Sequence, residues 1–202
     1  MSFNDAAEKA ALRKQLRAAR RALDPALHRL HSRKAARLIA RLPQFSTGRR
    51  VAIYLPFDRE IDTAPLIAAA RRRGVRLFVP VVSDRRHGRL TFHPLSSRLR
   101  RGAFGILVPA GGGATVAARW LHLIVVPFVG VDGAGRRLGM GGGFYDRAAA
   151  FRGLRKQWRG PRLIGFGFDC QRVDSVGAEV WDLRFDATAT EKGLQHHDWD
   201  DT

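Results

Sequence analysis

The pattern of apolar and polar positions predicts two helices at the start of the chain. Within residues 9–23, four side chains recur at helical spacing and share one apolar face, namely Leu12, Leu16, Ala19 and Leu23. Asp24 before Pro25 is typical of a helix N-cap followed by proline in the first turn. The leucines that follow predict a second helix, which Pro43 ends.

Short apolar runs then alternate with a third helical period. Residues 51–55 have the length and composition of a buried strand, and residues 75–82 form a second apolar run. Between them, Thr63 can cap a helix that extends to about Arg73, and Gly74 can close it in the left-handed conformation. This βαβ order favours two parallel strands with a right-handed crossover, and hence an α/β fold.

The second half of the chain continues this alternation. Further strands are expected at residues 89–93, 104–108, 121–127, 163–168 and 187–190. A turn at His87 and Gly88 leads into the first of them, and residues 132–135 form another turn. Residues 146–151 can begin a helix.

Length, apolar content and cysteine use limit the class of protein. With 202 residues, of which 45% are hydrophobic, we expect a single domain over residues 1–202, with its core at about residues 9–191. No uninterrupted apolar run approaches about 18 residues, so we expect a soluble protein without a membrane span. The N-terminus lacks a secretory signal pattern and Cys170 is the single cysteine, which together suit the cytoplasm.

The end of the chain resembles a metal-binding tract only superficially. Residues 195–198 read Gln, His, His and Asp. We expect residues 192–202 to form an acidic, flexible tail that frays from the domain.

An excess of basic residues adds a second constraint. The chain holds 36 Lys and Arg against 18 Asp and Glu, a formal charge of +18, which favours polyanionic partners without naming one. A proteome rich in arginine would produce part of this excess without any functional cause. In the first helix, Lys9, Arg13, Arg17 and Arg20 recur at helical spacing, so they either grip a common anion or form a solvated basic face.

The glycine-rich segment at residues 139–146 carries the most specific candidate chemistry. Four of its first five positions are glycine, so its backbone N–H groups can converge on an anion, although glycines alone also mark ordinary turns. Phe144 and Tyr145 add flat apolar surface, and Asp146 adds a candidate Mg²⁺ ligand. The segment stands between a predicted buried strand and a helix, where ligands of open α/β sheets bind.

Four separated motifs together resemble one protein family. They read KAALR at residues 9–13, YLPFDREIDT at 54–63, RLGMGGGFYDR at 137–147 and WD at 181–182. The third motif is the most specific, because it combines the glycine pattern with both aromatic residues and Asp146. On these motifs the chain resembles the 5-formyltetrahydrofolate cyclo-ligases, also called 5,10-methenyltetrahydrofolate synthetases, from residue 9 to about residue 191.

This resemblance implies a fold and a reaction. The fold would be a three-layer α/β/α arrangement with a mostly parallel sheet and a basic N-terminal helix. The reaction would be the ATP- and Mg²⁺-dependent closure of 5-formyltetrahydrofolate, which can carry a polyglutamate tail, to 5,10-methenyltetrahydrofolate with release of ADP and phosphate. Phosphorylation of the formyl oxygen would give an iminium phosphate, and N10 would close the ring as phosphate leaves. Such a site needs positioning and charge stabilisation rather than a protein nucleophile.

The resemblance also implies roles for individual residues. Mg²⁺ would be held by Asp146 and Asp186. ATP would contact Lys9, Arg13, Arg137, Leu138, Gly139, Met140, Gly141, Gly142, Gly143, Phe144 and Tyr145. The folate would contact Leu55, Phe57, Glu60, Met140, Gly141, Gly142, Gly143 and Phe144, and the Glu60 carboxylate would accept hydrogen bonds from the pterin ring.

Two departures from the family pattern affect these expectations. Val108 stands before Pro109 where the family commonly has glutamate or glutamine, which removes a polar contact. Met140 and Gly142 occupy positions that are basic in some members. The phosphate charge would then be balanced by Lys9, Arg13 and Arg137.

Other classes of protein remain as alternatives. A basic nucleic-acid-binding α/β protein is the main one, although no nucleic-acid module is recognised and we do not expect nucleic acid as a partner. A sugar-phosphate isomerase or an acyl-transferring enzyme would share the α/β layers, but fold similarity does not carry function. The sequence specifies neither an oligomeric state nor a preferred glutamate-tail length.

Overall fold

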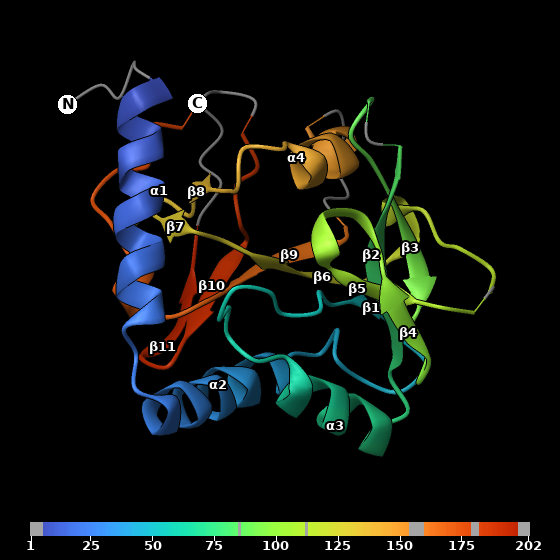
Figure 1. The fold of residues 1–202 in the computed structure, drawn as a ribbon. Helices are drawn as coiled ribbons and strands as arrows, with labels where there is room; N and C mark the ends of the chain where they lie inside the picture. Colours follow the sequence, from blue (N-terminus) through green and yellow to red (C-terminus); the bar gives the residue numbers. More distant parts are fainter. Residues whose placement is uncertain (1–5, 85, 112, 154–159, 179–181, 198–202) are drawn as a thin grey trace.

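A seven-stranded sheet organises the molecule, as the computed structural model shows for residues 6–84, 86–111, 113–153, 160–178 and 182–197 (Figure 1). The strands of this sheet are β1 (Arg50–Ala52), β2 (Arg76–Asp84), β3 (Arg89–Pro94), β6 (Leu123–Pro127), β9 (Arg162–Phe166), β10 (Ala187–Thr190) and β11 (Gly193–His196). Their order is β11-β10-β9-β6-β1-β2-β3. The five inner strands run parallel, and the two outer strands are antiparallel.

Two small ribbons and four helices complete the described fold. The ribbons pair β4 (Leu99–Arg101) with β5 (Leu107–Pro109), and β7 (Gly130–Val131) with β8 (Arg137–Leu138). The helices are α1 (Ala6–Arg21), α2 (Pro25–Ala40), α3 (Ala64–Arg72) and α4 (Phe144–Ala149). Short 3₁₀ turns follow at Ala103–Gly105, Ala118–Trp120, Ala150–Arg152 and Asp169–Gln171.

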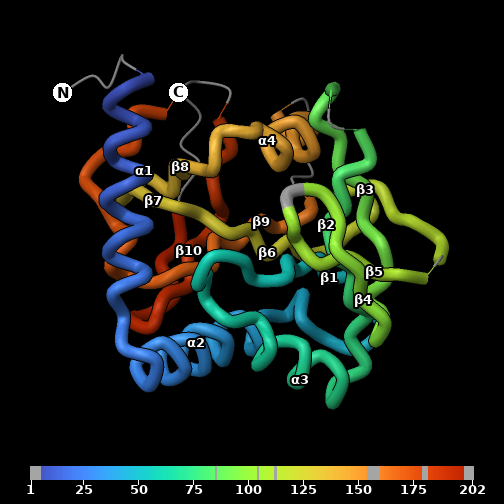
Figure 2. Tube along the Cα trace, in the orientation of Figure 1, coloured from blue at the N-terminus to red at the C-terminus, as the bar shows by residue number. Residues whose placement is uncertain are grey.

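The helices divide into two layers around the sheet, with α1 at one side. In Figure 1, α2 and α3 cover one face and α4 covers the other, while α1 stands beside β7 and β8. Figure 2 shows the same contact between the blue start of the chain and its yellow middle. Ile39 of α2 and Leu66 of α3 belong to the core on one face of the sheet, and Ile124 and Phe185 belong to the core on the other face. A third cluster packs Leu16 of α1 against Leu138. The three-layer α/β/α prediction is confirmed.

The helix signals are confirmed with one change of residue. Asp24 caps α2, since its Oδ1 accepts hydrogen bonds from the backbone N–H groups of Ala26 and Leu27. Thr63 precedes α3 but does not cap it with its side chain, because its hydroxyl donates to the Tyr54 carbonyl at 3.0 Å. Asp62 accepts from the Ala64 N–H instead, at 2.8 Å. Gly74 has φ +64°, as the predicted helix end requires.

Two sequence predictions are corrected. The strand expected at residues 104–108 is confirmed only in part. Its first two residues belong to the 3₁₀ turn Ala103–Gly105, where Gly105 adopts φ +74° and bends the chain, and β5 is limited to Leu107–Pro109. The prediction of a flexible tail is wrong for residues 193–197. Residues 198–202 lie outside the described part of the chain. Residues 193–196 form β11, since β10 offers them an unpaired edge, and His197 is buried against Thr188.

No helix in the described part of the chain is long and apolar enough to cross a membrane.

Candidate active site

A cavity of about 590 Å³ lies at the edge of the sheet where the parallel strands end. Its walls come from α1, the loop after β1, the loop after β6, the glycine-rich segment and α4. Every site residue expected from the sequence lines this cavity, with the exception of Asp186. The volume is in the range of pockets that enclose small organic ligands.

One wall combines basic side chains with exposed glycine backbone. Arg13 donates from Nε to the Gly139 carbonyl at 2.9 Å, which ties α1 to the glycine-rich segment 126 residues away. Gly141 and Gly143 have φ values of +93° and +59°, which explains why glycine occupies both positions. A Cβ atom at Gly139 would lie 2.5 Å from Nη1 of Arg137, so a side chain there would displace the arginine.

Arg137 is the buried cation of this wall. Its side chain is 7% exposed, and Nη2 donates to Asp146 Oδ2 at 2.8 Å. The guanidinium also lies 5.8 Å from the centroid of the Tyr145 ring. Its buried Nε has no hydrogen-bond partner among the described residues.

Glu60 and Tyr54 form a second wall, and Tyr145 of the glycine-rich segment lies near both Glu60 and Arg137. Burial raises the pKa of Glu60 to about 7, although the Phe57 N–H and Arg20 both favour the ionised form. Burial, followed by the nearby Glu60 charge, raises the pKa values of Tyr54 and Tyr145. Near neutral pH this wall therefore offers a carboxyl group close to half ionisation beside two neutral phenols.

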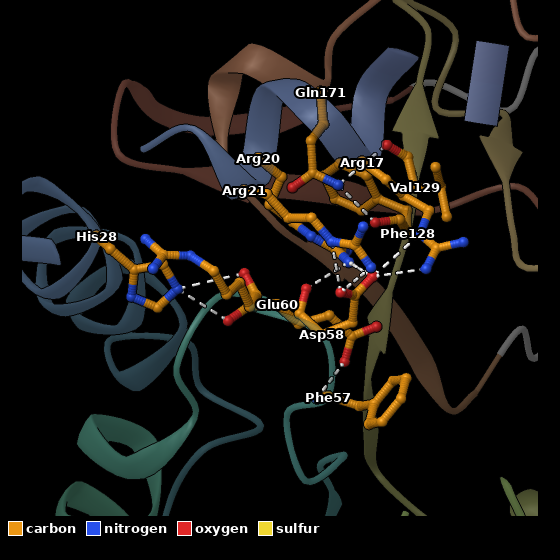
Figure 3. A network of polar contacts seen from close by, with 11 residues as sticks. Arg17, Arg20, Arg21, His28, Phe57, Asp58, Glu60, Phe128, Val129 and Gln171 are labelled. Atoms are coloured by element: carbon orange, nitrogen blue, oxygen red, sulfur yellow. Dashed lines mark hydrogen bonds and ion pairs between the residues drawn. The ribbon is translucent and has the colours of Figure 1, made fainter. Parts of the chain in front are cut away.

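The loop that carries Glu60 is fixed from two sides (Figure 3). The Phe57 N–H donates to Glu60 Oε2 at 3.0 Å, and His28 Nε2 donates to the Glu60 carbonyl at 3.1 Å. Asp58, which lies between Phe57 and Glu60 in the sequence, accepts hydrogen bonds from Arg17, Arg20 and Arg21 of α1. The basic stripe of α1 is thus not simply solvated, since part of it grips an anion that belongs to the protein.

Gln171 holds the loop after β6 (Figure 3). Its Nε2 donates to the carbonyls of Phe128 and Val129 at 2.7 and 3.0 Å. Its Oε1 accepts from the Phe168 N–H. Both carbonyl-bearing residues line the cavity.

The two expected metal ligands do not share the cavity. Asp146 lines it, with Oδ1 accepting from the Leu183 N–H at 3.0 Å. Asp186 lines a separate cavity of about 480 Å³ at the start of the strands, with Arg49, His122 and Arg162. Arg152 and the Leu163 N–H occupy its carboxylate. Asp182, from the fourth sequence motif, is the second carboxylate near Asp146 that lines the larger cavity, whereas Trp181 lies outside the described residues.

Sequence reasoning missed several residues of the site. Tyr54 resembled an ordinary strand residue, Asp58 was quoted only within the motif at residues 54–63, and Arg20 was noted only as part of the basic stripe. Arg147 was quoted as part of the glycine motif without a role. It donates to the Gly142 carbonyl and to Gly88 at the turn between β2 and β3. Only the tertiary contacts reveal these functions.

Val108 does not line the cavity, contrary to the concern raised by the family pattern. Its side chain is buried in β5, where it packs against Gly102. The cavity is lined instead by its neighbours Ile106 and Leu107. The apolar residue at position 108 is therefore accommodated by local packing.

Comparisons with known proteins agree with this geometry. The profile of the 5-formyltetrahydrofolate cyclo-ligase family matches residues 5–191. A 5-formyltetrahydrofolate cyclo-ligase of Escherichia coli K12 is 34% identical over 181 residues, which cover 87% of this chain and 96% of the relative. One from Haemophilus influenzae is 31% identical, covering 67% of this chain and 72% of the relative.

The solved structures give the same answer. The 5,10-methenyltetrahydrofolate synthetase of Aquifex aeolicus superimposes with a TM-score of 0.78 at 28% identity, covering 96% of this chain and 95% of that one. A synthetase of that name from Mycoplasma pneumoniae, at 23% identity and a TM-score of 0.68, shares the fold. The protein is an α/β enzyme of the ligase class in folate metabolism. The chain belongs to the 5-formyltetrahydrofolate cyclo-ligase family.

Proposed function

We propose that this enzyme closes 5-formyltetrahydrofolate to 5,10-methenyltetrahydrofolate, with ATP as co-substrate, Mg²⁺ as the metal, and ADP and phosphate as products. The observation that carries the proposal is that one cavity gathers the basic glycine-rich wall and the Glu60 wall. Members of the family from bacteria carry the same activity in their names. The proposal includes a cytoplasmic location and allows a polyglutamylated substrate.

The glycine-rich wall suits the triphosphate. Lys9, Arg13 and Arg137 bring positive charge to it, and the glycines let backbone N–H groups approach phosphate oxygens. The buried, unpaired Nε of Arg137 adds a donor that is already desolvated. Leu138, Met140 and Tyr145 supply apolar surface for the nucleotide.

The donor set near Arg137 fits Mg²⁺. Asp146 and Asp182 offer hard carboxylate oxygens at the cavity, and Mg²⁺ is usually bound by one or two carboxylates together with substrate phosphates. When bound there, the metal would neutralise phosphate charge during transfer. We do not extend this role to Asp186, because its carboxylate faces the other cavity.

The Glu60 wall suits the reduced pterin. An ionised Glu60 accepts hydrogen bonds from pterin N–H groups, while Leu55, Phe57 and Phe144 provide apolar and flat surfaces. The chain then acts mainly by positioning, since the formyl oxygen must lie in line with the γ-phosphorus. The formyl oxygen takes the γ-phosphoryl group as ADP leaves, which makes this oxygen a leaving group. N10 then attacks the former formyl carbon and loses its proton, and phosphate departs with the C–O electron pair.

An assay of purified enzyme tests this function. With 5-formyltetrahydrofolate, ATP and Mg²⁺, we expect the strongly absorbing methenyl product, together with one ADP for each product molecule. Replacing ATP by a non-hydrolysable analogue is the matched control and should abolish product formation. Absence of ATP-dependent product at high enzyme concentration would contradict the proposal.

A further inference from the structure

The turn at residues 57–60 is held in an unfavourable backbone conformation. Asp58 and Arg59 have φ values of +51° and +57°, and neither is glycine. Two consecutive residues in the left-handed region cost free energy, so other contacts must hold the turn. Glu60, the residue proposed to contact the pterin, follows directly.

Three arginines of α1 provide those contacts (Figure 3). Arg17 Nε and Arg20 Nη2 each donate to Asp58 Oδ2 at 3.0 Å, and Arg21 Nε donates to Oδ1 at 2.7 Å. Arg20 Nη2 also donates to the Asp58 backbone carbonyl at 2.7 Å, so it fixes the main chain as well as the side chain. Burial acts to raise the pKa of Asp58, yet the hydrogen bonds from Arg21 and Arg17 hold this pKa below its usual range.

The centre of the clamp is shielded from solvent, and its outer part is not. Arg20 is 1% exposed and the Asp58 side chain is 10% exposed, whereas Arg17 and Arg21 are 33% and 52% exposed. The Arg20 contact is therefore the one least weakened by solvent screening. Arg20 and Asp58 also line the cavity beside Glu60. Several charge-assisted hydrogen bonds to one carboxylate restrict its position, so the Asp58 side chain is fixed relative to α1.

We propose that Asp58 is a positioning residue, which uses the clamp from Arg17, Arg20 and Arg21 to hold the Glu60 carboxyl where the folate binds. Asp58 does not contact the reacting atoms in this proposal, which rests on the proposed function. The same helix carries Lys9 and Arg13 at the nucleotide wall, so α1 sets the placement of both walls.

Equilibrium binding to the intact enzyme tests this role, with 5-formyltetrahydrofolate and a Mg²⁺-bound, non-hydrolysable ATP analogue measured separately. Asp58→Gly removes the clamp but makes the left-handed backbone easier to adopt. We expect folate binding to weaken about 10- to 100-fold through loss of the Glu60 hydrogen bonds, with the affinity for the ATP analogue unchanged. Asp58→Asn, which tolerates the left-handed region and keeps one acceptor, should lie between wild type and Asp58→Gly.

Two matched variants separate the clamp from other effects. Arg59→Gly relieves backbone strain in the same turn and removes the hydrogen bond from Arg59 to the Leu23 carbonyl, while leaving the Asp58 contacts in place. If the clamp on Asp58 is what positions Glu60, this variant should keep the folate affinity of the wild type. Asp84→Asn removes a carboxylate whose ion pair is with His87 at the β2–β3 turn, and should change neither affinity.

A double-mutant cycle decides whether Asp58 acts through Glu60. If it does, Asp58→Gly combined with Glu60→Gln should bind folate no more weakly than Glu60→Gln alone. Additive losses, or equal losses for folate and the ATP analogue, would overturn the positioning role. Wild-type folate affinity in Asp58→Gly would also overturn it, whereas a wild-type enzyme that does not bind 5-formyltetrahydrofolate would overturn the proposed function itself.

Discussion

The two edges of the parallel sheet hold aspartates with closely similar partners but different surroundings. At the carboxyl edge, Asp146 accepts from Arg137 at 2.8 Å and from the Leu183 N–H at 3.0 Å. Towards the amino edge, Asp186 accepts from Arg152 at 2.7 and 2.9 Å and from the Leu163 N–H at 2.6 Å. The two side chains are 21% and 17% exposed.

The difference lies in what each pair faces. Asp146 and Arg137 line the cavity that also contains Glu60, and Arg137 keeps a buried Nε without a partner among the described residues. Asp186 directly precedes β10, and its carboxylate accepts a hydrogen bond from the Leu163 N–H near the start of β9, so it ties these two strands together. Partners and burial are thus similar, and position on the sheet is what we propose separates a functional carboxylate from a structural one.

The largest expected effect comes from neutralising these aspartates one at a time. Asp146→Asn should lower turnover by about two orders of magnitude, because charge stabilisation by a bound metal is worth several kcal/mol. Asp186→Asn should keep turnover near that of the wild type. Both variants should lose about 1–3 kcal/mol of unfolding free energy, since each weakens a partly buried ion pair. Steady-state kinetics below both unfolding transitions, with denaturant titrations alongside, measure these effects.

The Mg²⁺ dependence of these variants sharpens the comparison further. If Asp146 is a ligand, Asp146→Asn should need more Mg²⁺ for half-maximal activity, and Asp186→Asn should not. If Asp186→Asn lost most of its turnover while its unfolding curve stayed normal, Asp186 would be needed for the reaction. That result would contradict the distinction between the two edges.

Sequence information was sufficient for much of this arrangement. Local signals such as the Asp24 cap, Gly74 and the apolar strands depend on neighbouring residues, so the elements could be predicted. The family motifs identified the cavity residues because three of them lie in α1, in the loop after β1 and between β8 and α4, which together line the cavity.

The remaining details depend on contacts between distant segments. Asp182 and Asp186 are four residues apart, and only the path of the chain across the sheet decides which one lines the cavity with Asp146. The partner of the α1 arginines is Asp58, 37 to 41 residues away, and no local pattern indicates it. The strand at residues 193–196 forms because β10 leaves an edge to pair, whatever the charge of the tail.

A smaller effect concerns the ionisation of Glu60, which has no counterpart at the amino edge. With a pKa of about 7 in the free enzyme, Glu60 must lose a proton to offer both oxygens as charged acceptors for pterin N–H groups. Folate affinity should therefore rise as pH increases towards 7, by at most about tenfold per unit, and then level off. Glu60→Gln should show a flatter profile between pH 5 and 8, and isothermal titration at several pH values measures both. An identical pH dependence in the variant would mean that Glu60 does not titrate with binding.

The smallest expected effect is on stability, and it tests the ionisation of Glu60 in the absence of any ligand. Its folded-state pKa of about 7 lies above the ordinary value of 4.5, so the folded protein binds the proton more tightly than the unfolded chain does. The resulting stabilisation is fully present below pH 4.5 and is lost as pH rises through 7, with an upper limit of about 3 kcal/mol. Glu60→Gln cannot ionise, so its unfolding free energy relative to wild type should increase between pH 5 and pH 8. Denaturant titrations of both proteins at the two pH values measure this change, with Asp186→Asn as a control that retains Glu60. A constant difference between Glu60→Gln and wild type would show that burial at the carboxyl edge does not tune this carboxyl group.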